Sequence, residues 1–216
     1  MVRAVIFDMD GLMFDTEPIW GKAWHPALAR FGLAYPEGLA DACRGTNGAV
    51  RTATVNRMCG IDYGDKVAAA LDEETARLLK TELRMKPGLV ELLDWLDGHG
   101  VPRAVASSSS VEMIESNLQT AGIADRFQAT VSGVGIGHSK PEPDIFLAAA
   151  AALGVEPSRA LVLEDSYAGV EAGHRGGFVT VMVPDMMPPT DKTRAWAAAT
   201  CGSLLEVRDL LAAGAL

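Results

Sequence analysis

The stretch VRAVIFDMDG, residues 2–11, decides the fold of this chain. It begins with a short, mainly apolar run, ends in the two acids Asp8 and Asp10, and is followed by a helical region. A short apolar run of this kind is typical of a central strand in a parallel sheet, because helices cover both faces of such a strand. We therefore expect a buried strand over residues 2–7, with two carboxylates at its carboxyl end.

Three later runs have the same character, the run at residues 129–132 is weaker, and all four alternate with helical patterns. The runs cover residues 103–106, 129–132, 160–163 and 178–183. Apolar residues at three- and four-residue spacing predict helices over residues 89–96, 111–118 and 143–153. Strands that alternate with helices form parallel sheets with right-handed crossovers. The expected fold class is α/β, a doubly wound parallel sheet.

Residues 17–86 interrupt this alternation. They contain no convincing strand, and the segments 19–31, 49–59 and 65–84 have helical patterns. A helical block placed after the first strand is most simply an inserted cap domain. The expected division is an α/β core domain of residues 1–16 and 87–216 and a helical cap domain of residues 17–86.

The overall composition limits the partners and the location. A chain of 216 residues is long enough for one large domain or for a core with a small insert. Its net charge of −9 repels the phosphates of nucleic acids and anionic lipids, so we expect neither as a partner. Three cysteines without metal-ligand spacing indicate reduced thiols in the cytoplasm, and the first apolar run is too short for a signal peptide or a membrane span. We expect a monomer or a weak dimer.

Reactive side chains follow the ends of several predicted strands, where open α/β sheets bind their ligands. They are Asp8, Asp10, Ser107, Lys140, Glu164 and Asp165. Four carboxylates placed together raise one another's pKa unless a cation neutralises them, and oxygen ligands suit Mg²⁺. Mg²⁺ and Lys140 together would neutralise a phosphate, so that a carboxylate nucleophile could approach phosphorus. The pattern therefore favours phosphoryl transfer.

Four motifs in order resemble those of the haloacid dehalogenase-like (HAD) superfamily. They are FDMDGLMFDTE (residues 7–17), VASSS (105–109), SKPEPDIF (139–146) and LEDSYAGVEAG (163–173). The resemblance covers essentially the whole chain. It implies a Rossmann-like HAD core with a helical cap, and a Mg²⁺-dependent phosphatase that forms an aspartyl phosphate.

The resemblance also implies a role for each residue of these motifs. Asp8 resembles the nucleophile, Asp10 the general acid and base, Ser107 the phosphate hydrogen-bond donor, and Lys140 the clamp that holds Asp8 and phosphate. The implied metal ligands are Asp8, Asp10 through its backbone carbonyl, Glu164 and Asp165. For substrate binding we expect contributions from Ser108, Ser109, Arg44 and Arg51.

The helical cap matches a subgroup that includes β-phosphoglucomutase and many small sugar-phosphate phosphatases. The mutase's cap-hinge histidine falls on Trp20, and its phosphate-gripping cap arginine falls on Gly48. Both departures favour hydrolysis, so the expected function is a phosphatase acting on a small phosphorylated metabolite such as a sugar phosphate. A sugar phosphomutase is the first alternative, and a non-catalytic phosphometabolite-binding protein is the second. A nicotinamide-dependent reductase is disfavoured, because SGVGIG (132–137) lacks dinucleotide-binding spacing and does not follow the first strand.

Overall fold

The computed structural model describes residues 2–43, 46 and 48–216. The chain folds into two compact units, a core unit of residues 1–15 and 84–216 and a cap unit of residues 16–83. Each unit has its own buried interior. None of the described helices is both long and apolar enough to cross a membrane.

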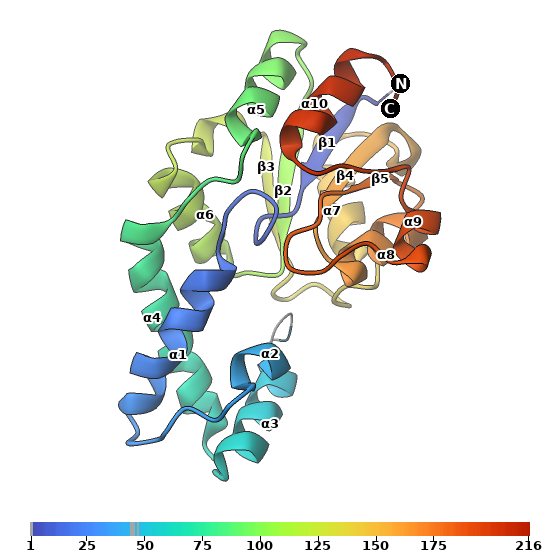
Figure 1. The fold of residues 1–216 in the computed structure, drawn as a ribbon. Coiled ribbons are helices and arrows are strands. Elements are labelled where there is room, and N and C mark those ends of the chain that lie inside the picture. Colours follow the sequence, from blue (N-terminus) through green and yellow to red (C-terminus); the bar gives the residue numbers. More distant parts are fainter. Residues whose placement is uncertain (1, 44–45, 47) are drawn as a thin grey trace. The chain divides into compact units, whose positions relative to one another are not determined.

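The core unit is built on a six-stranded parallel sheet with the strand order β3-β2-β1-β4-β5-β6 (Figure 1). The strands are β1 (Ala4–Phe7), β2 (Arg103–Ser107), β3 (Ala129–Ser132), β4 (Ala160–Glu164), β5 (Val179–Met182) and β6 (Ala199–Thr200). From β1 the chain builds the sheet outward through β2 and β3, and it then returns to the other side of β1 with β4. The order reverses beside β1, where open α/β sheets bind their ligands. The predicted fold class, a doubly wound α/β sheet, is confirmed.

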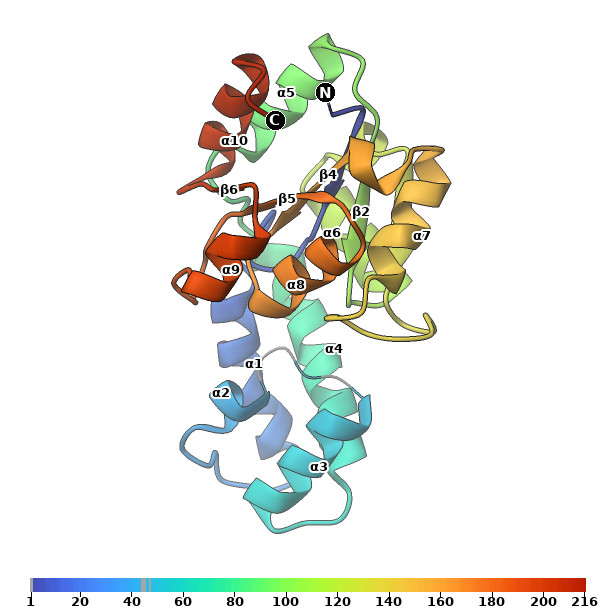
Figure 2. The same cartoon turned by 90° about the vertical axis from the view of Figure 1, so that its right-hand side faces the viewer.

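Helices cover the sheet, and its central strands β1, β2 and β4 are buried on both faces. The helices of this unit are α5 (Leu89–Gly98), α6 (Val111–Thr120), α7 (Asp144–Leu153), α8 (Tyr167–Arg175), α9 (Asp191–Trp196) and α10 (Leu204–Ala212), with short 3₁₀ turns at Ala124–Arg126 and Pro157–Arg159. Ile6 and Val162 belong to one buried cluster with Phe146 of α7. Their neighbours Val5 and Leu161, which point to the opposite face of a pleated strand, are also fully buried. Helix α10 lies beside α5 (Figure 2).

The cap unit is entirely helical within the residues described. It contains α1 (Glu17–Ala29), α2 (Leu39–Cys43), α3 (Gly48–Cys59) and α4 (Gly64–Glu82). Trp24 and Leu28 of α1 pack with Val67 and Leu71 of α4 around a separate apolar interior. Helix α2 has only five residues, too few for an apolar period to reveal it in the sequence.

The two segments that join the units pair with each other inside the core unit. Phe14 forms an antiparallel bridge with Met85. The Asp15 N–H donates to the Arg84 carbonyl at 2.9 Å, and the Lys86 N–H donates to the Met13 carbonyl at 2.8 Å. These bonds place residues 84–86 in the core unit, whereas the sequence placed them in the cap.

Candidate active site

Asp8 and Asp10 stand on a tight turn that follows β1. The Met13 and Phe14 N–H groups both donate to the Met9 carbonyl, and the Gly11 N–H donates to Phe14 at 2.9 Å. Gly11 has a φ of +84°, and a Cβ there would lie 2.5 Å from Asp165 Oδ2. Only glycine fits this position, because it accepts the left-handed backbone and leaves room for the acid. The turn can therefore approach the end of β4 closely.

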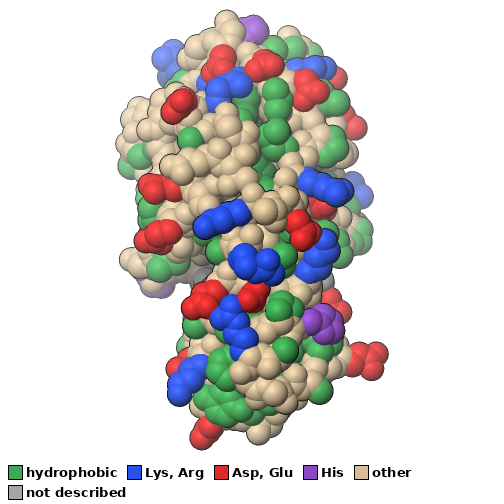
Figure 3. Space-filling model, turned by 90° about the vertical axis from the view of Figure 1, so that its left-hand side faces the viewer, with side chains coloured by type: hydrophobic (Ala, Val, Ile, Leu, Met, Phe, Trp, Pro, Cys, Tyr) green, Lys and Arg blue, Asp and Glu red, His purple; other side chains and the backbone are tan. Residues whose placement is uncertain are grey.

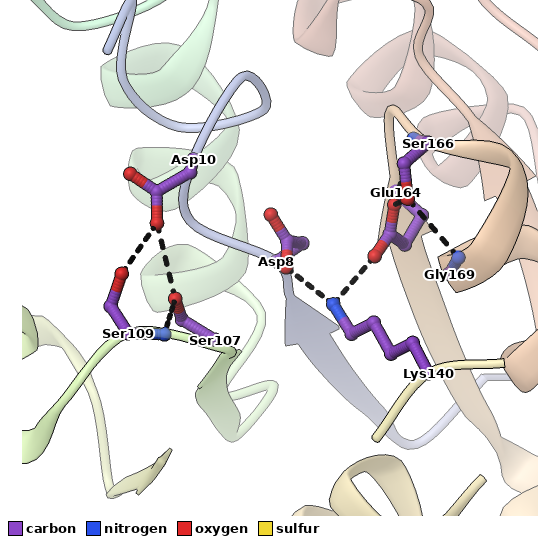
Figure 4. A network of polar contacts seen from close by, with 8 residues as sticks. All are labelled: Asp8, Asp10, Ser107, Ser109, Lys140, Glu164, Ser166 and Gly169. Carbon is purple, nitrogen blue, oxygen red and sulfur yellow. Dashed lines mark hydrogen bonds and ion pairs between the residues drawn. The ribbon is translucent and has the colours of Figure 1, made fainter. Parts of the chain in front are cut away.

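Lys140 joins two carboxylates from different strands. Its Nζ donates to Asp8 Oδ1 at 2.5 Å and to Glu164 Oε1 at 2.6 Å (Figure 4). It also lies 4.8 Å from the centre of the Phe146 ring, a cation–π contact. The Lys140 and Asp8 side chains are each 9% exposed and that of Glu164 is 1% exposed, so water screens these charges little. The ammonium group is the cation that makes two neighbouring buried carboxylates tolerable.

Glu164 is held firmly on its other side. Its Oε2 accepts hydrogen bonds from the Ser166 N–H at 2.8 Å and the Ser166 hydroxyl at 2.9 Å. The same hydroxyl accepts from the Gly169 N–H at 3.1 Å and so caps α8. A Cβ at Gly169 would lie 1.7 Å from Glu164 Oε1, so a larger residue there would displace the acid. Glu164 thus packs against the first turn of α8 and accepts a hydrogen bond from Lys140.

Asp10 turns toward the loop after β2. Its Oδ2 accepts from Ser107 Oγ at 3.2 Å and from Ser109 Oγ at 2.9 Å. In Figure 4, Asp8 lies between Asp10 on one side and Lys140 with Glu164 on the other. The second oxygen, Asp10 Oδ1, is buried and has no hydrogen-bond partner among the described residues. Asp10 Oδ1 is therefore available for a further hydrogen bond at this end of the sheet.

The acids at this edge fit a divalent cation. Asp8, Glu164 and Asp165 each offer an oxygen, and these oxygens lie within 4.8 Å of one another. Burial raises the pKa of Asp8 to about 7, against the opposing charge of Lys140. Burial, with the nearby charge of Glu164, raises the pKa of Asp165 to about 9. The raised pKa values show that these carboxylates ionise with difficulty unless a cation is nearby. Carboxylate oxygens are also the kind of ligand that Mg²⁺ prefers.

The remaining expected site residues lie in different surroundings. Ser108 is exposed on the loop after β2, next to the partly buried Ser109. Arg51 belongs to the cap unit, where it donates to Asp72 at 2.6 Å and its guanidinium carbon lies 5.5 Å from the centre of the Trp20 ring. Arg44 lies outside the described residues. The structure thus gathers Asp8, Asp10, Ser107, Ser109, Lys140, Glu164 and Asp165 at one edge of the core sheet.

Sequence reasoning missed several residues that the structure adds to this edge. Ser166 follows the acids of β4 directly, and a serine at the start of a helix is a common N-cap signal. Asp185 follows the run of residues 178–183, so the rule of strand ends would have included it. No sequence signal marks Gly169, because the need for it arises from the position of Glu164.

A family model of the haloacid dehalogenase-like hydrolases matches residues 2–177. The chain belongs to this family. Two relatives from Escherichia coli (strain K12) are similar to this HAD-like hydrolase. Fructose-1-phosphate phosphatase YqaB is 32% identical over 181 residues, which span 83% of this chain and 95% of the relative. Hexitol phosphatase B is 31% identical over an alignment that covers 97% of each chain.

Solved structures show the same relationship. The crystal structure of CbbY from Rhodobacter sphaeroides in complex with phosphate matches this HAD-like hydrolase with a TM-score of 0.82 and 25% identity, over 96% of each chain. The resemblance drawn from the four sequence motifs is therefore confirmed. So is the expected enzyme class, a phosphoric monoester hydrolase of the HAD type.

Proposed function

We propose that this HAD-like hydrolase is a Mg²⁺-dependent phosphatase that hydrolyses a small phosphorylated metabolite, such as a sugar phosphate, through an aspartyl phosphate on Asp8. The observation that carries the proposal is the position of Asp8, which lies between Lys140 at 2.5 Å and the group formed by Asp10, Ser107 and Ser109. The printed names of relatives, which refer to fructose 1-phosphate and hexitol phosphatases, support a sugar phosphate substrate.

The donors of the site suggest how the metal is held. Asp8 and Asp165, with the backbone carbonyl of Asp10, would provide the protein's direct ligands. Both oxygens of Glu164 already accept hydrogen bonds from Lys140 and Ser166, so Glu164 contributes its charge and the position of Lys140. A bound Mg²⁺ would neutralise phosphate charge that otherwise repels a carboxylate nucleophile.

In the first step, an Asp8 carboxylate oxygen attacks phosphorus, and the bond from phosphorus to the ester oxygen breaks. Asp10 gives its proton to the leaving oxygen, while Lys140 and Ser107 hold the phosphoryl oxygens. In the second step, Asp10 takes a proton from water as that water attacks phosphorus, which frees Asp8 and releases inorganic phosphate. Proton transfer by a well-placed acid typically accelerates such a step by about 10²–10⁴-fold.

Among the described cap residues, the interactions of Arg51 bear on the choice between hydrolysis and phosphomutase chemistry. A mutase has to hold a second phosphate, and that task calls for a free cation. Arg51 donates to the Asp72 carboxylate at 2.6 Å, and only 14% of its side chain is exposed. Its charge is therefore largely balanced within the cap, which makes Arg51 poorly suited to holding a second phosphate.

The surface and the thiols agree with a small-molecule enzyme of the cytoplasm. The net charge is −9, and on the face drawn in Figure 3 basic side chains lie among acidic ones. Such a surface does not favour binding to nucleic acid. All three cysteines are free thiols, which suits a reducing compartment.

Phosphate release from a panel of phosphorylated sugars, nucleotides and glycolytic acids, measured with and without Mg²⁺, tests the proposal. We expect Mg²⁺-dependent hydrolysis of at least one sugar phosphate and its loss in Asp8→Asn. A phosphosugar isomer formed only with a sugar bisphosphate primer would instead identify a mutase. Full activity of Asp8→Asn would contradict the covalent route.

A further inference from the structure

Asp185 is a largely buried acid that the proposed reaction does not use. It follows β5 on a segment where the Val183 N–H donates to the Glu164 carbonyl at 2.7 Å, so the segment runs beside the end of β4. Its Oδ1 accepts from Lys86 Nζ at 2.6 Å, and 13% of its side chain is exposed. Its other oxygen, Oδ2, is buried and has no hydrogen-bond partner among the described residues.

Gly11 shows where this unpartnered oxygen lies. A Cβ at Gly11 would stand 2.5 Å from Asp165 Oδ2 and 3.4 Å from Asp185 Oδ2. Both distances are measured from the same Cβ position, so Asp165 Oδ2 and Asp185 Oδ2 lie within about 6 Å of each other. One bridging water can cover that distance. Asp185 does not belong to the group of acids whose oxygens gather closely enough to hold an ion together. The position of Asp185 therefore allows a contact with a bound ion through a water molecule.

Lys86 holds Asp185 at this position. Its backbone N–H donates to the Met13 carbonyl at 2.8 Å, which ties it to the turn that follows β1. Its side chain holds Asp185 Oδ1, so the acid is fixed relative to the same turn that contains Gly11. The ammonium also balances the negative charge that Asp185 adds near an already acidic cluster.

We propose that Asp185 is a positioning residue for the divalent ion of this phosphatase, with Oδ2 accepting a hydrogen bond from a water that the ion carries. Buried acceptors in native proteins nearly always have a partner, and Mg²⁺ usually keeps several of its waters. This role rests on the metal site of the proposed function. It adds to that site an acid that touches neither the substrate nor the ion directly.

Isothermal titration of the intact chain with Mg²⁺ tests this role without reference to activity. We expect Asp185→Asn to weaken Mg²⁺ binding by about 10–100-fold, as is typical when a group that orients metal ligands is changed. Asp185→Asn also leaves the Lys86 cation unpaired, which could repel Mg²⁺ by itself. The double variant Lys86→Gln/Asp185→Asn removes both charges, and we expect it to bind Mg²⁺ as weakly as Asp185→Asn does.

Asp97→Asn is the matched control. Asp97 accepts from the buried Arg103 at the start of β2, whereas the site lies at the other end of that strand, so Mg²⁺ affinity should stay within threefold of wild type. Circular dichroism establishes that each variant is folded. Wild-type affinity in the double variant, or in a folded Asp185→Asn, would overturn the role of Asp185. Failure of the wild type itself to bind Mg²⁺ would instead refute the proposed metal site.

Discussion

Binding of Mg²⁺ near neutral pH should release protons from the site. Without a cation, burial raises the pKa of Asp8 to about 7 and that of Asp165 to about 9. The two acids are close enough to titrate as a pair, so the protons belong to the pair rather than to either acid. Metal ligands have to be deprotonated, and Mg²⁺ must therefore displace whatever protons the pair holds.

The size of the effect follows from these two values. With these two values the pair holds between about one and two protons at pH 7. At pH 8 it holds about one proton. Each proton released makes the Kd fall about tenfold per pH unit, so the Kd for Mg²⁺ should fall by about ten- to thirtyfold between pH 7 and pH 8.

Titration calorimetry in two buffers with different ionisation enthalpies counts the released protons directly. Asp97→Asn serves as the control, because it removes a carboxylate outside the site and should leave the proton count unchanged. An affinity that stays constant from pH 6 to pH 8, with no proton released at pH 7, would refute the account of the acids as a buried, cation-dependent cluster.

Three further predictions concern turnover, backbone fit and stability. Asp10→Asn should lower kcat by about 10²–10⁴-fold with little change in KM, because it removes proton transfer while the serines that bind Asp10 remain; a kcat near that of wild type in steady-state kinetics would contradict this. Gly169→Ala should lower kcat by about 10²-fold, since a Cβ 1.7 Å from Glu164 Oε1 displaces the acid that holds Lys140. Gly21→Ala in α1 meets no atom within 4 Å and should leave kcat unchanged; a kcat in Gly169→Ala equal to that of Gly21→Ala would contradict the role given to Glu164. In EDTA, the contribution of Asp8 and Asp165 to stability should be complete below about pH 4 and decline as pH rises through about 7 and about 9, because folding raises both pKa values. Calorimetry should therefore show a Tm gain from Mg²⁺ that grows from pH 6 to pH 9, and a gain that shrinks would reverse the predicted sign.

Much of the fold and the chemistry of the core could be predicted from local sequence features. The apolar runs beginning at Ala4 and Ala160 identify buried parallel strands, because such strands are covered on both faces. Acids placed directly after these runs meet at one sheet edge, since parallel strands end on the same side. For this reason Asp8 and Asp165 could be assigned to one site although they are far apart in the chain.

The different surroundings of two neighbouring acids could not be predicted from the positions of strand ends. Glu164 and Asp165 are adjacent, and from the sequence we expect Asp165 to bind the metal with Glu164 in support. Successive side chains at a strand end point in opposite directions, so their surroundings differ. In the structure Glu164 accepts hydrogen bonds from Lys140 and Ser166, whereas Asp165 lies against Gly11.

By itself, the sequence determined the α/β class, the helical insert and the set of core residues available for phosphoryl transfer, because these depend on short-range patterns and strand direction. Only the tertiary structure decided which oxygens have partners, why position 169 must be glycine, and that Asp185 and Lys86 stand beside the acids of the site. Those features depend on contacts between segments far apart in the chain, and no local pattern of residues encodes such contacts.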